Sequence, residues 1–225
     1  MICPLLGKGR TMEKQVPEYC IWDFNGTILD DVEAGICAVN HLLAERGMPC
    51  LAGKDDYRAV FGFPIRSYYE RLGFDFTKEP YEVIAPLWVE QYLHYVKQAD
   101  VFADVRDTLF LLRSRGVRQV VLSATEIGML GGQLRALGLT AFFEEILGLD
   151  NIHAASKLSL AQAWRARHPD ASVLWLGDTD HDVEVAKAIG ARCALIARGH
   201  QARETLASLG VSVYDDLKTA IQHEM

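Results

Sequence analysis

The sequence lacks an excess of basic residues. Its 225 residues contain 23 Lys and Arg against 30 Asp and Glu, which gives a formal net charge of −7 at pH 7. Proteins that bind nucleic acids or anionic membrane surfaces by charge need clustered Lys and Arg. The composition therefore argues against a nucleic-acid or membrane partner, and we expect small molecules as partners of a monomer or homodimer.

Paired cysteines and long apolar runs are also missing. The five cysteines include no C-x-x-C pair, so the sequence indicates neither a disulfide framework nor a zinc knuckle. No apolar run approaches the roughly 18 residues of a membrane span. We therefore expect a cytoplasmic protein with one full core and a smaller annex. Residues 1–16 have no clear period and are expected to form an extension outside the fold.

Short apolar runs alternate with helical stretches from residue 18 onward, and Gly116, Gly138 and Gly190 follow three of these stretches as stops. This alternation predicts an α/β fold, with a parallel sheet between two layers of crossover helices, as in Rossmann-like proteins. The expected strands are YCIWDF (19–24), VRQVVLSA (117–124), AFFEEIL (141–147), SVLWLGD (172–178), RCALIA (192–197) and VSVYD (211–215). The expected core helices cover 104–115, 126–137, 157–168 and 180–189.

One interval interrupts this alternation. Residues 31–100 show no convincing strand and only helical periodicity, as in the segment EVIAPLWVEQYLHYV. We therefore expect an all-helical subdomain over 31–100, inserted into a core formed by residues 17–30 and 101–225.

Chemically active side chains follow the ends of the predicted strands. Asp23 and Ser123 end the first and second, Lys157 precedes the fourth, and Asp178 and Asp182 follow the fourth in WLGDTDHD. Because ligands of such sheets bind outside the carboxyl ends of the strands, we expect these side chains to meet. Any one of them alone would be more readily explained as a turn or cap residue.

Together these residues supply what transfer of a phosphoryl group to a carboxylate needs. Asp23 can attack phosphorus, and Mg²⁺ held by Asp23 and Asp178 would offset the repulsion between two anions. Ser123 can donate a hydrogen bond to a phosphoryl oxygen, and Lys157 can neutralise charge on both groups. Backbone amides near Gly26 and Thr27 would add donors.

In DFNGTILD, VVLSAT, SKLSLA and GDTDHDVEVAKAIGA, the sequence resembles the haloacid dehalogenase superfamily. The similarity runs from about Tyr19 to the C-terminus and favours the phosphatase branch with a helical cap, of the phosphoglycolate phosphatase or β-phosphoglucomutase type. The resemblance implies that the segment 31–100 is the cap, which closes over the site and selects a small phosphorylated metabolite.

The resemblance also implies a role for each matching residue. Asp23 would be the nucleophile and a ligand of Mg²⁺, and the backbone carbonyl of Asn25 would be a further ligand. Asp178 would complete the metal ligands from the protein, with Asp182 binding directly or through water. The phosphoryl group would be held by Gly26, Thr27, Ser123, Ala124 and Lys157.

The sequence departs from the family's phosphatases at Asn25, where they carry an Asp that protonates the leaving oxygen. An amide cannot exchange a proton near neutral pH, so we expect low turnover of ordinary esters and the smallest loss for acyl and aryl phosphates. Asn25 could also merely shape the turn before Gly26, or could have been introduced to trap a substrate. The competing hypothesis is a phospho-ligand-binding or regulatory protein that no longer turns over.

Other relatives and residues fit less well. Asp178 and Asp182 argue against a dehalogenase, and Lys54, Lys78 and Lys97 are too weakly placed for a phosphonate-cleaving enzyme. Arg66 could reach an anionic part of the substrate or remain a solvated helix residue. His181 is expected to be exposed to solvent. Tyr68 and Tyr69 are expected in the core or at the rim of the cap, and three further aromatic residues are expected to pack within the cap rather than form a base-stacking platform: Trp88, Tyr92 and Tyr95.

Overall fold

The computed structural model describes residues 15–152 and 156–225, so most of the predicted extension over residues 1–16 lies outside the described residues. A six-stranded parallel sheet has the order β3-β2-β1-β4-β5-β6. Its strands are β1 Tyr19–Trp22, β2 Arg118–Glu126, β3 Glu145–Leu149, β4 Val173–Gly177, β5 Arg192–Ile196 and β6 Ser212–Tyr214. The predicted parallel α/β fold is confirmed.

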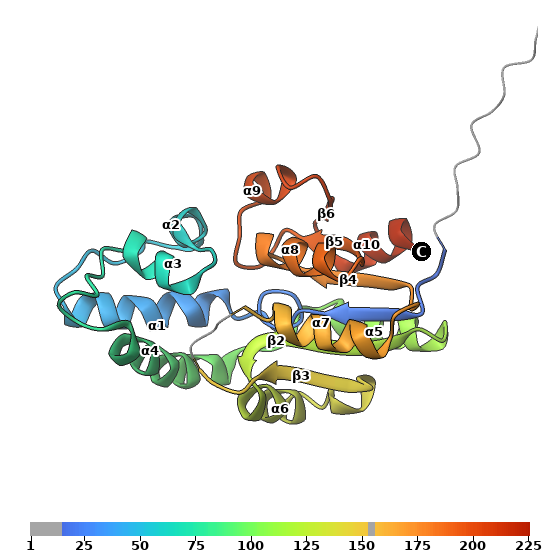
Figure 1. Cartoon of the computed structure of the whole chain (residues 1–225). Helices are drawn as coiled ribbons and strands as arrows, with labels where there is room; N and C mark the ends of the chain where they lie inside the picture. The colour runs from blue at the N-terminus through green and yellow to red at the C-terminus, as the bar shows by residue number, and fades with distance from the viewer. Residues whose placement is uncertain (1–14, 153–155) are drawn as a thin grey trace, which may run out of the picture.

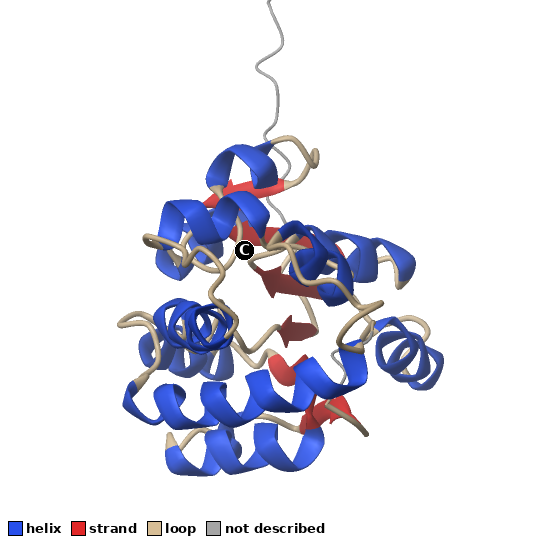
Figure 2. Cartoon of the chain, turned by 90° about the vertical axis from the view of Figure 1, so that its left-hand side faces the viewer, coloured by secondary structure: helices blue, strands red, loops and turns tan. Residues whose placement is uncertain are grey.

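Helices cover both faces of this sheet (Figure 2). Side chains alternate across the strands, so Cys20 and Trp22 face one hydrophobic cluster while Tyr19 and Ile21 face the other. The first cluster packs against α5, α6 and α10, and the second against α7 and α8. These helices are α5 Val105–Ser114, α6 Ile127–Ala136, α7 Leu158–Arg167, α8 Asp180–Ala188 and α10 Leu217–Glu224, and a short α9 spans Arg203–Ala207.

The third predicted strand begins later than the sequence suggested. A 3₁₀ helix, η2 Thr140–Phe142, occupies the apolar residues expected to open it, and β3 starts at Glu145. Phe142 still packs against the core, which explains the apolar pattern without a strand. Periodicity alone does not distinguish a short buried strand from a turn that is anchored in the core.

Between β1 and α5 the described chain forms helices joined by loops, and it adds no strand to the sheet. The elements are α1 Val32–Glu45, α2 Lys54–Val60, α3 Ile65–Arg71, α4 Tyr81–Tyr95 and the 3₁₀ helix η1 Val96–Gln98. Helices α1 to α4 share a hydrophobic cluster of their own, which includes Val39 and Leu43 of α1 and Tyr69 of α3. This segment, called the helical cap below, lies at the end of the sheet toward which the strands point (Figure 1).

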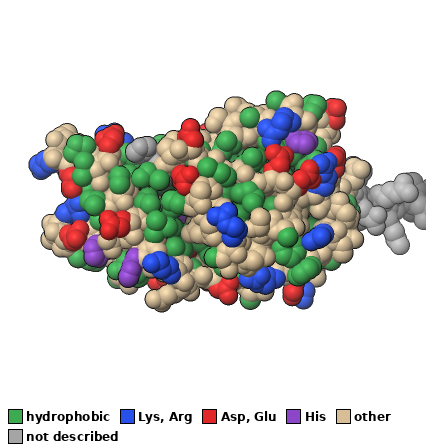
Figure 3. Space-filling model, turned by 90° about the horizontal axis from the view of Figure 1, so that it is seen from below, with side chains coloured by type: hydrophobic (Ala, Val, Ile, Leu, Met, Phe, Trp, Pro, Cys, Tyr) green, Lys and Arg blue, Asp and Glu red, His purple; other side chains and the backbone are tan. Residues whose placement is uncertain are grey.

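Lys and Arg side chains are scattered among acidic ones on the face seen from below (Figure 3). Among the described residues, no helix combines the length and apolar character that crossing a membrane requires.

Candidate active site

The carboxyl edge of the sheet gathers the predicted site residues from four separate elements. Asp23 follows β1, Ser123 lies within β2, Lys157 precedes α7 and Asp178 follows β4. All four are buried, with at most 7% of any residue exposed. The expectation that strand ends would bring these side chains together is therefore met by the geometry.

Lys157 bridges two carboxylates. Its Nζ lies 2.7 Å from Asp23 Oδ1 and 2.7 Å from Asp182 Oδ1. Burial alone would lower the pKa of Lys157, but the charges of Asp182 and Asp23 outweigh burial and raise it. The lysine therefore stays charged and holds the Asp23 carboxylate in place.

Both carboxylate oxygens of Asp182 accept hydrogen bonds from protein groups. Oδ1 accepts hydrogen bonds from Lys157 Nζ (2.7 Å) and Trp175 Nε1 (3.0 Å). Oδ2 accepts from the amides of Asp178 (3.1 Å) and Thr179 (3.0 Å) and from Thr179 Oγ1 (2.7 Å). These bonds leave little capacity for a metal, so we assign Asp182 to positioning Lys157 and the turn after β4. Its predicted metal contact, direct or through water, stays a prediction.

Asp178 is held in a close backbone cradle. Its carboxylate accepts hydrogen bonds from Thr27 Oγ1 (2.9 Å) and from the His200 amide (2.7 Å). A Cβ added at Gly26, where φ is +70°, would lie 2.3 Å from Asp178 Oδ2, and one at Gly199 would lie 2.1 Å away. Both positions therefore require glycine to let the backbone approach this carboxylate.

The cluster carries more buried negative than positive charge. Ligand atoms of Asp23, Asp178 and Asp182 lie within 4.8 Å of one another, with Lys157 as the paired cation. Burial, followed by the charge of Asp182, raises the pKa of Asp23, and burial is also the main cause of the raised pKa of Asp178. A divalent cation with hard oxygen ligands would offset this charge, so the residues present fit Mg²⁺.

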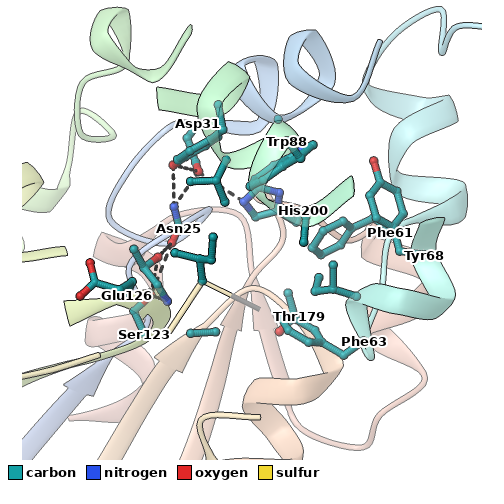
Figure 4. A pocket seen from close by; sticks show the side chains of 18 of the residues that line it. Asn25, Asp31, Phe61, Phe63, Tyr68, Trp88, Ser123, Glu126, Thr179 and His200 are labelled. Atoms are coloured by element: carbon teal, nitrogen blue, oxygen red, sulfur yellow. Dashed lines mark hydrogen bonds and ion pairs between the residues drawn. The ribbon is translucent and has the colours of Figure 1, made fainter. Parts of the chain in front are cut away.

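The Asn25 side chain is fully engaged (Figure 4). Its Nδ2 donates to Asp31 Oδ2 (2.8 Å) and to the Tyr92 hydroxyl (2.8 Å), and its Oδ1 accepts from Thr125 Oγ1 (2.7 Å). Ser123 Oγ lies 3.4 Å from the same Oδ1. Asn25 therefore links the core, through Thr125, to Tyr92 of the helical cap. Its side chain does more than shape the turn before Gly26.

Asp31 forms a second buried charge centre beside Asn25. One oxygen accepts from the Gly26 amide (2.9 Å) and lies 3.3 Å from His200 Nε2, while the other accepts from Tyr92 (2.7 Å). Burial alone would raise the pKa of Asp31, but His200 and these donors lower it. Burial alone would lower the pKa of His200, whereas Asp31 raises it to about 9. His200 Nδ1 also lies 2.8 Å from the hydroxyl of Tyr57 in the cap.

A pocket lies between this edge and the helical cap, with about 1040 Å³ of empty space when the part open to solvent is included. Its core wall includes Asp23, Asn25, Ser123, Ala124 and Lys157, and its cap wall is rich in aromatic side chains. A phosphoryl group bound at Asp23 would therefore have its leaving group directed toward the cap.

The structure also gives the surroundings of the weaker candidates, and the prediction about His181 needs correction. Arg66 does not line the pocket, because it pairs with Glu70 (3.4 Å) and stacks over Phe76 (4.9 Å). His181 is buried rather than exposed, with its ring stacked on Phe63 at 4.6 Å. Trp88 and Tyr92, expected to be cap packing, stack on each other but also line the pocket, as do Tyr68 and Tyr69.

Comparison with known proteins decides the family. The profile of haloacid dehalogenase-like hydrolases matches residues 20–196, which is most of the chain. The chain belongs to this family. Membership confirms the resemblance seen in the sequence and places this haloacid dehalogenase-like chain among hydrolases.

Curated relatives align over most of the chain. A phosphoglycolate phosphatase from Pseudomonas savastanoi is 26% identical over 219 residues, covering 92% of this chain and 79% of the relative. One from Caulobacter vibrioides is 28% identical over 201 residues, covering 85% and 84%. These named relatives are phosphatases, in agreement with the branch that the sequence indicated.

Solved structures share the fold. A haloacid dehalogenase-like hydrolase from Streptococcus pneumoniae has a TM-score of 0.76 at 19% identity, covering 93% of this chain and 99% of that one. CbbY from Rhodobacter sphaeroides, solved in complex with phosphate, has a TM-score of 0.66 at 20% identity, covering 89% and 94%.

Sequence reasoning missed several residues of this haloacid dehalogenase-like site. Asp31 directly follows the first motif, and Thr125 lies two residues after Ser123. His200 follows the carboxyl end of β5, which lies next to β4 in the sheet. The rule that ligands bind at strand ends would have flagged His200.

Proposed function

We propose that this chain is a Mg²⁺-dependent phosphatase that hydrolyses small phosphorylated metabolites through a phosphoryl-Asp23 intermediate. The observation that carries the proposal is the buried Asp23 carboxylate, held 2.7 Å from Lys157 Nζ at the floor of the pocket. The phosphatase names of the relatives, and the phosphate bound in the CbbY structure, support the same chemistry. A cytoplasmic location and a monomeric or dimeric state stay predictions.

The first half-reaction would transfer the phosphoryl group to Asp23. A carboxylate oxygen of Asp23 forms a bond to phosphorus while the bond from phosphorus to the leaving oxygen breaks. Lys157 and Ser123 would offset charge on the phosphoryl oxygens. Mg²⁺, held by Asp23, Asp178 and the carbonyl of Asn25, would supply additional positive charge. A water molecule would then attack phosphorus and release phosphate, which restores Asp23.

Asn25 limits which leaving groups can depart. Its amide is too weak an acid to protonate a leaving oxygen near neutral pH, and its two Nδ2 hydrogens are directed at Asp31 and Tyr92. Acyl and aryl phosphates release weakly basic oxygens that need no proton. Their hydrolysis should therefore be slowed least by the missing acid at position 25.

The competing function is a phospho-ligand-binding protein without turnover. Phosphate release from alkyl, aryl and acyl phosphates, measured with Mg²⁺ and again with EDTA, separates the two. We expect release from acyl and aryl phosphates that EDTA abolishes. No Mg²⁺-dependent release from any compound would favour the binding protein.

Replacing Asp178 by Asn should weaken Mg²⁺ binding by at least about 100-fold, since it removes an acidic ligand from the cluster. The matched control is Asp180→Asn, because Asp180 lies in the same turn but outside the carboxylate cluster and bonds to Gln201. Isothermal titration with Mg²⁺ measures both variants. Unchanged Mg²⁺ affinity in Asp178→Asn would remove the basis for the metal site.

A further inference from the structure

The cap wall of the pocket is rich in aromatic side chains, among them Phe61, Phe63, Tyr68 and Trp88 (Figure 4). Tyr57 and Phe61 stack with ring centroids 5.1 Å apart, and Phe61 contacts Tyr68 at 5.3 Å and Phe63 at 6.1 Å. Trp88 lines the same pocket from α4. This wall provides flat apolar area where the leaving group of a phosphate ester would lie.

The cations that line this pocket, among the described residues, are already paired. Lys157 lies between Asp23 and Asp182, and His200 faces Asp31. The remaining charged residue of the lining, Glu126, is acidic, and its carboxylate accepts from two amides at the start of α6. A negative charge on the leaving group would find no free cation on the described walls. The hydroxyl of Tyr68 and the indole nitrogen of Trp88, which have no hydrogen-bond partner within the described part of the chain, are neutral donors.

Three arginines of α2 and α3 are engaged elsewhere. Arg58 donates to the carbonyl oxygens of Gly199 (2.9 Å) and Arg198 (2.7 Å), which fastens α2 to the core. Arg71 donates to the Val60 carbonyl (2.6 Å), and Arg66 pairs with Glu70. None of the three lines the pocket.

We propose that this pocket selects phosphate monoesters whose leaving group is uncharged and aromatic, and rejects those that carry a carboxylate. The inference rests on the proposed phosphatase function and extends it to a substrate class. Two independent features agree, because Asn25 favours leaving oxygens of low basicity and the cap wall favours flat apolar rings. A buried carboxylate without a cationic partner is costly. The carboxylate-bearing phosphoglycolate should therefore be a poor substrate.

A matched pair of compounds tests this proposal. 4-Carbamoylphenyl phosphate and 4-carboxyphenyl phosphate have nearly the same shape, but only the second carries a charge on its ring. We expect kcat/KM to be about 100-fold higher for the carbamoyl compound. Calorimetric binding of both compounds to the Asp23→Asn variant, which cannot form the phosphoryl-enzyme, should show the same preference without turnover.

A pair of variants tests the same proposal by adding a positive charge to the pocket wall. Val89 is a half-buried residue of the pocket wall on α4. Val89→Lys should raise the relative binding of the carboxyphenyl compound by about 10-fold, the gain of one charge-assisted hydrogen bond. Val89→Met adds a side chain of similar length without charge and should leave the ratio unchanged.

The possible outcomes separate the two proposals. Preference for the carbamoyl compound in both turnover and binding supports the substrate class. Equal or better binding of the carboxyphenyl compound overturns it, even if both compounds are hydrolysed. Preference in binding with no hydrolysis of either compound, or of acetyl phosphate, overturns the proposed phosphatase function and supports the neutral aromatic pocket.

Discussion

Replacing Asp23 by Asn is expected to lower phosphatase turnover by at least about 10⁴-fold on every substrate, because the variant lacks the attacking carboxylate. The amide has the size of the carboxylate, so the oxygen that faces Lys157 Nζ at 2.7 Å can be retained. A phosphate-release assay with acetyl phosphate and one aryl phosphate, at saturating Mg²⁺, measures the loss.

The control for this variant is Asp30→Asn, which removes an exposed carboxylate seven residues away. Turnover of Asp30→Asn should stay near that of the unchanged protein. An Asp23→Asn variant that folds and keeps turnover within about 10-fold would show that another group attacks phosphorus.

Exchanging the amide and the carboxylate at positions 25 and 31 should raise turnover of alkyl phosphates by about 10²–10⁴-fold, the range of general acid–base catalysis. In Asn25→Asp combined with Asp31→Asn, position 25 gains a proton donor for the leaving oxygen. The new amide at position 31 can still accept from the Gly26 amide and can donate toward position 25 in place of the present bond. Acyl phosphates should gain less in the first half-reaction.

The single variant Asn25→Asp is the informative control. Its new carboxyl oxygen would stand 2.8 Å from Asp31 Oδ2, where the amide nitrogen is now. Two carboxylates so close share a proton, so the carboxyl group at position 25 would bond to Asp31. The gain in turnover of alkyl phosphates should therefore be smaller than in the double variant. If neither variant gains on an alkyl phosphate, Asn25 does not stand in for an acid, and the native reaction needs its amide.

The sequence predicts the sheet and the core of the site because both depend on short-range rules. Buried strands appear as apolar runs, and parallel strands bring their carboxyl ends to one edge. Asp23, Ser123 and Asp178 therefore meet for a reason that can be read from their positions after three runs. The helical content of the cap follows in the same way from its periodicity.

The contacts across the pocket could not be predicted, since they depend on how the helical cap sits on the core. Tyr92 is a regular apolar position of its helix, yet its hydroxyl reaches Asp31 and Asn25. Tyr57 similarly reaches His200 from α2. The full hydrogen bonding of Asn25, and hence the coupling of its replacement to Asp31, appears only when both parts are placed.

The surroundings of Arg66 and His181 were equally hidden from the sequence. Arg66 begins a cap helix, a position that suits either a substrate contact or a solvated side chain, and it lies against Glu70 and Phe76. His181 was expected in solvent because it follows a polar motif, whereas Phe63 of the cap covers it. Neither outcome is encoded in the local pattern of charges.

The most direct test is to capture the phosphoryl-enzyme. The protein would be mixed with acetyl phosphate and Mg²⁺, quenched in acid within the first turnovers and mapped by peptide mass spectrometry. The account predicts one added phosphoryl group on the peptide that contains Asp23, absent with EDTA and absent in Asp23→Asn. Hydrolysis with no phosphoryl group on Asp23, or with the group on another residue, would contradict it.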